Sequence, residues 1–274
     1  GITSFIVYAK AKGAIKEVRE EQLTQNAQST ANLVDLWAGQ RMVEVESLAK
    51  QTLIVTSTQD SYMGRNARTA VNDELMKLAE KYDYIESMNL ADVNGELFCG
   101  SDPAILGKVQ VGDRGYFKAS ISGENHISKP IKSRVTGNPV FVIASPVLDG
   151  DQTAGVLFMV VDIAAFDVQY VDPIQIGAEG YAVLVTEEGD FIAHPKTELI
   201  LEANVKTDYD FGPQIQGESG TFYYTFYGDE KVMSYHQSTL TGWIVLMTAE
   251  TSDIFSSARE LKVTVGIIAL GMVV

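Results

Sequence analysis

The chain has 274 residues, and its 21 Lys and Arg against 36 Asp and Glu give a formal net charge of −15. This acidic balance argues against nucleic acid and anionic lipid as partners, because both attract clustered basic side chains. One cysteine and three histidines exclude an internal disulfide and leave too few ligands for a thiolate or histidine-rich metal centre.

Both ends of the chain are apolar. Residues 263–274 contain one polar side chain, Thr264, and residues 1–9 are mostly apolar. Neither run alone reaches the ~18–20 residues that cross a bilayer, although each continues to the edge of the sequence. We interpret residues 1–9 as the end of a first transmembrane helix, and residues 251–274 as a C-terminal helix that enters a second one. Two buried terminal segments are the alternative.

Residues 10–83 show helical periodicity. No proline occurs between Lys10 and Leu53, and apolar residues recur every three or four positions. At 1.5 Å per residue, a helix of this length extends roughly 60 Å, which is long enough to pass more than one domain. A second helix is predicted from Ala67 to Lys81.

Period-two alternation then indicates strands. Tyr84 to Phe98 is predicted to form a hairpin around Asn94-Gly95, a strong turn signal between alternating runs. A short helix is predicted at 114–121, and three further strands at 126–131, 139–148 and 153–163.

The second half of the chain repeats this order. Residues 181–195 restate the hairpin, with Glu188-Gly189-Asp190 where the first half has Asn94-Gly95-Glu96. Repetition at an offset of about 90 residues predicts two tandem α/β units, a first unit at 84–163 and a second unit at 164–250. Chance similarity of two hairpins is the alternative. The later strands of the second unit are predicted at 220–227, 230–238 and 241–249.

A locally basic segment lies at 108–134, with six Lys or Arg and two acidic residues. Such a segment attracts small anions, and the planar fork of Arg114 suits a carboxylate through two parallel hydrogen bonds. Tyr116 and Phe117 would provide rigid apolar walls for a small ligand. A solvated basic stretch is the alternative interpretation.

Asp162 closes the otherwise apolar strand 155–163. A carboxylate at such a position is costly unless it is paired or lies at the wet end of the strand. It is therefore expected either to cap the strand end or to act as a counter-charge for a ligand ammonium group.

Three motifs carry a resemblance to a known family: Asp113-Arg-Gly-Tyr-Phe117, Val160-Val-Asp162-Ile163 and Glu188 to Pro195. They resemble motifs of the double Cache sensor domain of bacterial transmembrane receptors, which include chemoreceptors and sensor histidine kinases. The resemblance covers most of the chain. It implies an α+β fold with a long N-terminal helix and two tandem PAS-like units, each with a five-stranded antiparallel sheet. It also implies ligand binding in the first, membrane-distal unit, transmission by the second, membrane-proximal unit, and no catalysis.

The chain departs from the amino-acid-binding pattern of this family. Val109 or Val111 stands where those members carry Tyr, and His126 and Lys129 replace a Tyr and an acid around Ser128. The exchange of an acid for a cation weakens the case for a ligand ammonium group and favours a carboxylate. The resemblance and the local charge together predict ligand-binding residues Arg114, Tyr116, Phe117, His126, Ser128, Lys129 and Asp162.

No catalytic or metal-binding residue is predicted, because no phosphate loop, dinucleotide fingerprint or Gly-x-Ser-x-Gly motif occurs. We expect no cofactor and no enzymatic activity. The resemblance, together with the apolar ends, implies the periplasmic or extracellular sensor domain of a chemoreceptor held in the cell membrane by flanking helices. The receptor would be a homodimer, and the domain would bind an amino acid or organic carboxylate. The alternatives are a histidine kinase or cyclase sensor, and an ectodomain that acts through a periplasmic partner protein without a small ligand.

Overall fold

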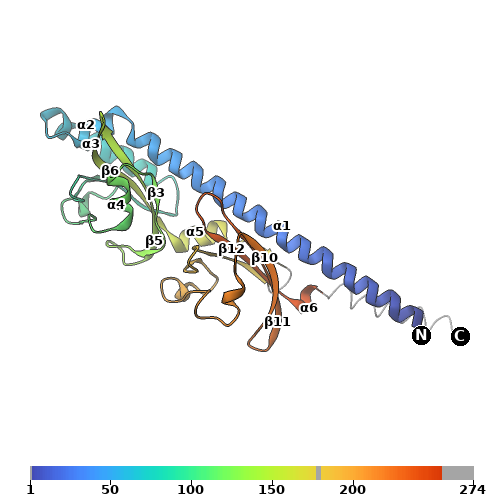
Figure 1. The fold of residues 1–274 in the computed structure, drawn as a ribbon. Coiled ribbons are helices and arrows are strands. Elements are labelled where there is room, and N and C mark those ends of the chain that lie inside the picture. The colour runs from blue at the N-terminus through green and yellow to red at the C-terminus, as the bar shows by residue number, and fades with distance from the viewer. Residues whose placement is uncertain (1, 177–179, 255–274) are drawn as a thin grey trace.

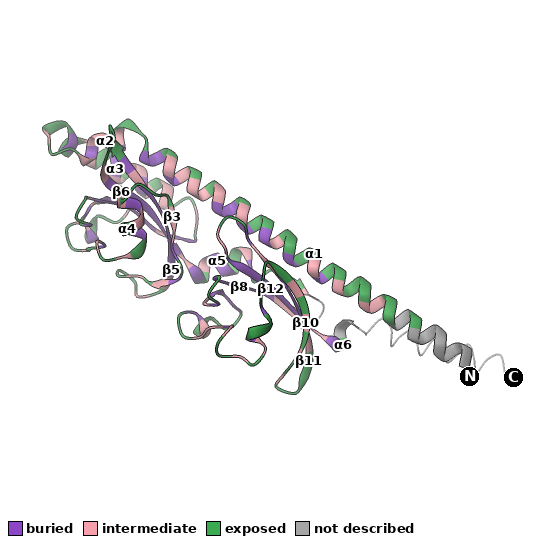
Figure 2. Cartoon of the chain, viewed as in Figure 1, coloured by how far each residue is buried: buried purple, intermediate pink, exposed green. Residues whose placement is uncertain are grey.

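A computed structural model describes residues 2–176 and 180–254. The α+β class is as predicted, because one long helix precedes two antiparallel sheets. The helix α1 (Ile2–Ala49) runs along one side of both units (Figure 1). Its buried positions face the sheets and its exposed positions face outward (Figure 2).

The N-terminal helices differ in their bounds from the predicted ones. The helix predicted to continue to Leu53 stops at Ala49, and α2 (Thr52–Thr58) begins after Gln51, whose backbone is extended. The next helix, α3 (Tyr62–Ala79), begins five residues earlier than predicted. Its start is fixed by Ser61, whose hydroxyl accepts a hydrogen bond from the Gly64 N–H at 3.0 Å.

The first unit contains a sheet in the order β2-β1-β6-β5-β3, with β4 also paired to β5. It has six strands rather than five, because the predicted strand at 126–131 is two short strands on either side of Pro130, which has no N–H to donate. The elements are β1 (Ile85–Ala91), β2 (Leu97–Gly100), a 3₁₀ turn (Pro103–Ile105), α4 (Gly115–Ile121), β3 (His126–Ile127), β4 (Ile131–Lys132), β5 (Pro139–Asp149) and β6 (Gln152–Asp162).

The helix α5 (Ile163–Tyr170) leads into the second unit, whose sheet has the order β10-β11-β12-β8-β7, with β9 also paired to β8. This sheet also has six strands, because the short β7 adds to the five predicted. The elements are β7 (Gln175–Ile176), β8 (Gly180–Val185), β9 (Phe191–Ala193), 3₁₀ turns (Thr197–Leu199 and Gly212–Gln214), β10 (Ser219–Phe226), β11 (Asp229–Gln237), β12 (Ile244–Glu250) and α6 (Thr251–Ile254).

The last strand begins at Ile244 and not at Thr241 as predicted. The preceding residues turn around Asp35 of α1, whose carboxylate accepts the N–H groups of Thr239 at 3.0 Å and Leu240 at 3.1 Å. Burial raises the pKa of Asp35. The hydrogen bonds from Thr239, Leu240 and the Ser238 hydroxyl together have the larger effect, so the pKa of Asp35 is lowered. The contact ties the second unit to the long helix.

The two units repeat each other closely. An isolated bridge pairs Glu96 with Gln110 in the first unit, and another pairs Asp190 with Asn204 in the second, an offset of 94 residues in both cases. The hairpin glycines Gly95 and Gly189 share this offset, and both have positive φ, +87° and +102°. The predicted tandem repeat is therefore present in the backbone.

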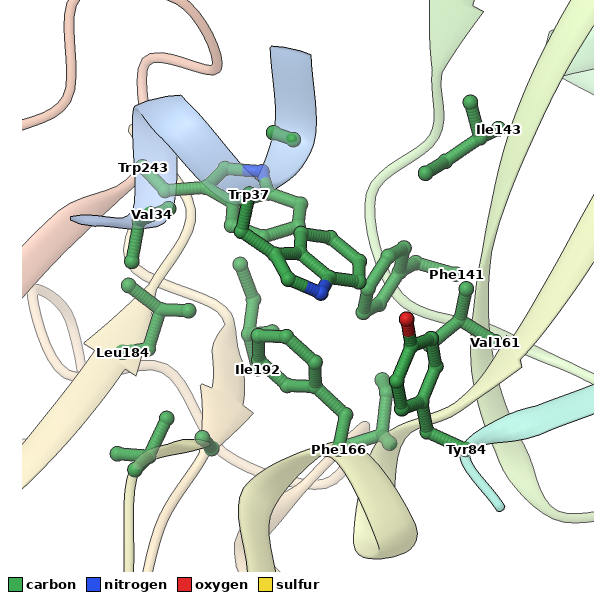
Figure 3. Packing of buried hydrophobic residues seen from close by; sticks show 14 of the residues in the cluster. Val34, Trp37, Tyr84, Phe141, Ile143, Val161, Phe166, Leu184, Ile192 and Trp243 are labelled. Carbon is green, nitrogen blue, oxygen red and sulfur yellow. The ribbon is translucent and has the colours of Figure 1, made fainter. Parts of the chain in front are cut away.

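The two units share one core. Trp37 of α1 packs against Phe141 of β5 and Phe166 of α5, with ring centroids 5.8 and 4.8 Å apart. Trp243, just before β12, lies 5.1 Å from Phe141 (Figure 3). Residues from both units and from the long helix thus meet in a single apolar cluster.

At the end of the described chain, α6 begins at Thr251 and contacts α1. The predicted continuation of this helix through 255–274 lies outside the described residues. Within the described parts of the chain, no helix is both long and apolar enough to cross a membrane.

Candidate ligand-binding site

A cavity lies on one face of the first unit's sheet, beside residues 131–136, which begin with β4 and which we call the flap. Val140 and Val142 of β5 line it, whereas Phe141 between them points into the core shared with α1. The cavity measures about 40 Å³, which is room for only a few water molecules. This space is too small to enclose a ligand the size of an amino acid.

The strand β1 contributes polar side chains to this cavity. Ser87 and Asn89 are spaced by two, so both point to the same face. A register shift between Ile85 and Ser87 brings Glu86 to the cavity as well, which is a common use of a β-bulge beside a binding site. The Asn89 amide donates to the Ser87 hydroxyl at 2.8 Å, and among the described residues its buried Oδ1 has no hydrogen-bond partner.

The flap is held down by hydrogen bonds to β1 and to the start of α4. Glu86 accepts the hydroxyls of Ser133 at 2.6 Å and Thr136 at 2.7 Å. On the other side, the Arg114 guanidinium donates through Nη2 to the Lys132 carbonyl at 2.9 Å. The Arg114 group predicted to bind a carboxylate is thus bonded to an oxygen of the chain itself.

A second arginine braces the same segment. Arg134 donates to the Gln110 carbonyl and pairs with the Asp113 carboxylate. The hydrogen bond from Arg134 lowers the pKa of Asp113. Of the charged residues that line the cavity, Arg114, Lys132 and Arg134 are cationic and Glu86 is anionic, a balance of +2 that favours an acidic ligand.

Tyr116 and Phe117, predicted as walls of the ligand site, both belong to α4 and are buried. The Tyr116 ring lines the cavity and lies 5.2 Å from the ring of Phe158. Burial raises the pKa of Tyr116, so its phenol stays protonated and can donate. Phe117 packs in the apolar cluster behind the cavity and is not among its lining residues.

Three other predicted residues lie away from this cavity. His126 is in β3, paired with Ala144 of β5. The Ser128 hydroxyl accepts from the Val142 N–H at 2.9 Å and donates to the Lys129 carbonyl at 2.8 Å, which holds the bend between β3 and β4. The Lys129 side chain is exposed. The structure brings together Arg114 and Tyr116 but not these three.

Asp162 is also placed elsewhere. Its Oδ1 accepts the Ala165 N–H at 2.9 Å, which makes it the N-cap of α5, and its Oδ2 accepts from the Asn138 side chain at 3.3 Å. It does not line the cavity. The strand-end cap is the alternative that the geometry favours for this residue.

The sequence analysis did not single out Glu86, Ser87 or Asn89. Polar residues spaced by two in an otherwise apolar strand are the signal that would have indicated Ser87 and Asn89. Glu86 had no such signal, because its placement depends on the bulge. Within the described ranges 2–176 and 180–254, no group of three His, Cys, Asp or Glu side chains is arranged to hold a metal ion.

Comparison with known proteins gives a family match over most of the chain, with residues 11–258 matching the Cache domain. The methyl-accepting chemotaxis protein McpA of Bacillus subtilis is 20% identical over 262 residues, covering 95% of this chain and 38% of McpA. The chain therefore spans well under half the length of this curated relative.

Solved structures show the same fold. The ligand-binding domain of the amino acid chemoreceptor PctB from Pseudomonas aeruginosa, in complex with L-Arg, gives a TM-score of 0.71 at 19% identity, covering 89% of this chain and 93% of that one. That of the chemoreceptor CtaA from Pseudomonas fluorescens, in complex with L-isoleucine, gives 0.71 at 18% identity, covering 90% and 98%. The motifs, the two repeated sheets and the match over residues 11–258 agree, and this chain belongs to the Cache domain family.

Proposed function

We propose that this domain is the extracytoplasmic ligand-sensing part of a transmembrane chemoreceptor and that it binds a small carboxylate or amino acid in the cavity of the first unit. The observation that carries the proposal is the group of three cationic side chains around this cavity, with Arg114 already bonded to a carbonyl oxygen. A ligand carboxylate is a stronger partner for a guanidinium than a neutral carbonyl, because both partners are charged.

Binding in this cavity requires the flap to open. A carboxylate that reaches Arg114 displaces the Lys132 carbonyl, and a ligand amino group that reaches Glu86 displaces the Ser133 and Thr136 hydroxyls. The ligand thus replaces the flap contacts made by Arg114 and Glu86, while the Arg134 bonds and the β4–β5 pairing are not replaced. Because the ligand competes with these flap contacts, its binding favours the open conformation over the closed one. A sensor needs such a difference in ligand affinity between two conformations.

The moving segment is connected to the second unit. Asn138, at the base of the flap, bonds to Asp162, and Asp162 caps α5. The helix α5 contacts β5 and β6 of the first sheet and β9 of the second. We infer that flap opening shifts α5 and then the second sheet, whose last strand continues directly into α6.

The remaining features of the proposal concern the whole receptor. The start of α1 and the segment α6 lie at the same end of the molecule, so flanking helices would enter the membrane on one side (Figure 1). The relative McpA is a methyl-accepting chemotaxis protein, and we propose a chemotactic output and a homodimeric receptor for this chain as well.

A calorimetric screen of the twenty amino acids and of mono- and dicarboxylates tests the proposal. We expect saturable binding of at least one compound. The Glu86→Gln variant then separates the two ligand classes, because it should weaken binding of an amino acid and leave a simple carboxylate nearly unaffected. If no compound of either class binds, the ligand-sensing proposal fails and the partner-protein alternative replaces it.

A further inference from the structure

The second unit contains its own cavity, at the place that corresponds to the cavity of the first unit. Ser87, Asn89 and Leu97 line the first cavity, and the residues 94 positions later, Tyr181, Val183 and Phe191, line the second. The strand pairing agrees, since Asn89 lies opposite Phe158 and Val183 opposite Leu246, and both partners are lining residues too. The two cavities are therefore repeats of one site.

The chemistry of the second cavity is different. Its volume is about 140 Å³ against about 40 Å³ in the first unit. Of the fifteen described residues that line it, seven are Phe or Tyr, and Lys196 is the only Lys, Arg, Asp or Glu. An aromatic wall with one cation and no acid favours a flat apolar ligand that carries a negative charge, and disfavours a cationic one.

Neutral hydrogen-bonding groups complete the cavity. The buried His194 ring accepts the Lys196 N–H at Nδ1, at 2.8 Å, so in the neutral ring Nε2 carries the proton and can donate. Burial lowers the pKa of His194 to about 4, which keeps the ring neutral at neutral pH. The Tyr224 and Thr248 hydroxyls, which also line the cavity, are bonded to each other at 2.7 Å.

A strained residue stands at the edge of this cavity. Tyr227, in the two-residue turn between β10 and β11, has φ +50° and is 90% exposed, yet it lines the cavity with its ring 4.5 Å from that of Phe226. Such turns favour Asn-Gly, because both central residues need positive φ. An aromatic side chain held there at a conformational cost is an observation that points to function.

We propose that the second cavity is a separate binding site for a small aromatic carboxylate, a single planar ring with one acidic group. The size fits, because an apolar cavity of about 150 Å³ holds one benzene molecule. In this arrangement the ring lies among the aromatic side chains and under Tyr227, and the carboxylate faces Lys196 and His194. The proposal goes beyond the ligand of the first unit and does not depend on it.

Titration calorimetry of the purified chain with benzoate tests this site, with benzyl alcohol and benzylamine as neutral and cationic probes of similar shape. We expect saturable binding of benzoate at millimolar concentration or below, weaker binding of benzyl alcohol, and none of benzylamine. Lys196→Gln removes an exposed side chain and should leave the fold intact. It should weaken benzoate about tenfold and leave benzyl alcohol unchanged, because one charge-assisted hydrogen bond is lost.

Two further variants test whether benzoate binds in the second cavity. Val205→Phe fills the cavity and should abolish binding of both benzoate and benzyl alcohol, with folding checked by thermal unfolding. Arg114→Ala lies in the other unit and should leave benzoate affinity unchanged. The proposal is overturned if benzoate does not bind, if Lys196→Gln leaves its affinity intact, or if Arg114→Ala removes it. The first two outcomes leave the proposed ligand of the first unit untouched, and the third would place benzoate at Arg114 in the first cavity.

Discussion

The two cavities occupy the same face of the same kind of sheet, but they differ in what fills and covers them. In the first unit, Arg114 and Glu86 hold the flap down and leave about 40 Å³. In the second unit, aromatic rings surround about 140 Å³ with a single charged side chain at the edge. Under the proposals above, binding in the first cavity is coupled to movement of the flap, whereas the larger aromatic cavity has room for a small ring without that movement.

The difference in volume arises from the covering segments and not from the sheets. At equivalent positions the second unit carries larger side chains, Tyr181 for Ser87 and Phe191 for Leu97, and yet it has the larger cavity. The first unit covers its sheet with α4 and the flap, and the stretch that corresponds to α4 in the second unit contains only the 3₁₀ turn at 212–214. The segments that cover each sheet therefore determine the cavity volume, although the two sheets share one fold.

The largest expected effect tests whether charge controls the first cavity. In Arg114→Ala, a ligand carboxylate buried in the cavity loses its cationic partner, which costs on the order of 2–5 kcal/mol. Affinity for the ligand found in the screen should fall at least about 30-fold, as measured by calorimetry. Folding should survive, because Arg114 lies outside the apolar strands.

Arg114→Lys is the matched control for this prediction. Lysine keeps the charge but not the planar fork, so affinity should be intermediate between those of the wild type and the Ala variant. Unchanged affinity in Arg114→Ala would contradict the placement of the ligand carboxylate and would remove the basis for the contrast between the two cavities.

The second prediction concerns acid stability, which should depend on the second unit. The pKa of His194 is about 4 in the folded chain because of burial, against about 6.5 for an unfolded histidine. As pH falls from about 6.5 to about 4, the unfolded state takes up a proton that the folded state does not, so the free energy of unfolding decreases. The expected loss is on the order of 1–3 kcal/mol.

His194→Asn should abolish this loss while leaving an acceptor for the Lys196 N–H. The measurement is denaturant unfolding of both proteins at pH 7, 5.5 and 4. Asp167 gives an opposite slope, because burial raises its pKa to about 6, but it is present in both proteins and cancels from the difference. Parallel pH profiles of the two proteins would show that His194 carries no acid sensitivity.

The third prediction separates structure from binding at Asp162. Because this carboxylate caps α5 and does not line the first cavity, Asp162→Ala should destabilise the fold by about 0.5–2 kcal/mol. Asp162→Asn keeps a capping group and should be nearly neutral in stability. A large loss of amino acid affinity in the Asn variant, without a loss of stability, would instead show that Asp162 contacts a ligand ammonium group.

Much of this architecture could be predicted from the sequence. The repeat, the two hairpins at Gly95 and Gly189, and the α+β class follow from periodicity and turn chemistry, which are local properties. Arg114 and Tyr116 were singled out because they lie in one short motif, and both line the first cavity.

The features that the sequence analysis did not predict depend on tertiary contacts. The short strands β4 and β7 have two residues each, too few to show alternation, and Glu86 reaches the cavity only through a bulge. The β10 residues that line the second cavity, Tyr224 and Phe226, follow the pattern of an ordinary half-buried strand. The space in this cavity depends on how the covering loops pack, and no local pattern in the sequence shows this.

The smallest expected effect concerns the edge of the second cavity. A residue other than glycine at φ +50° is strained, and Asn tolerates this conformation better than Tyr, so Tyr227→Asn should stabilise the chain by about 0.5–1 kcal/mol. This corresponds to a rise in Tm of about 1–4 °C.

If Tyr227 covers a bound ring, the same variant should weaken benzoate binding several-fold, so that stability and affinity change in opposite directions. Leu201, with φ +69° and outside the cavity lining, is the matched control: Leu201→Asn should relieve strain without changing benzoate affinity. Tyr227→Asn with full benzoate affinity would mean that the strained tyrosine serves the turn alone and takes no part in ligand binding.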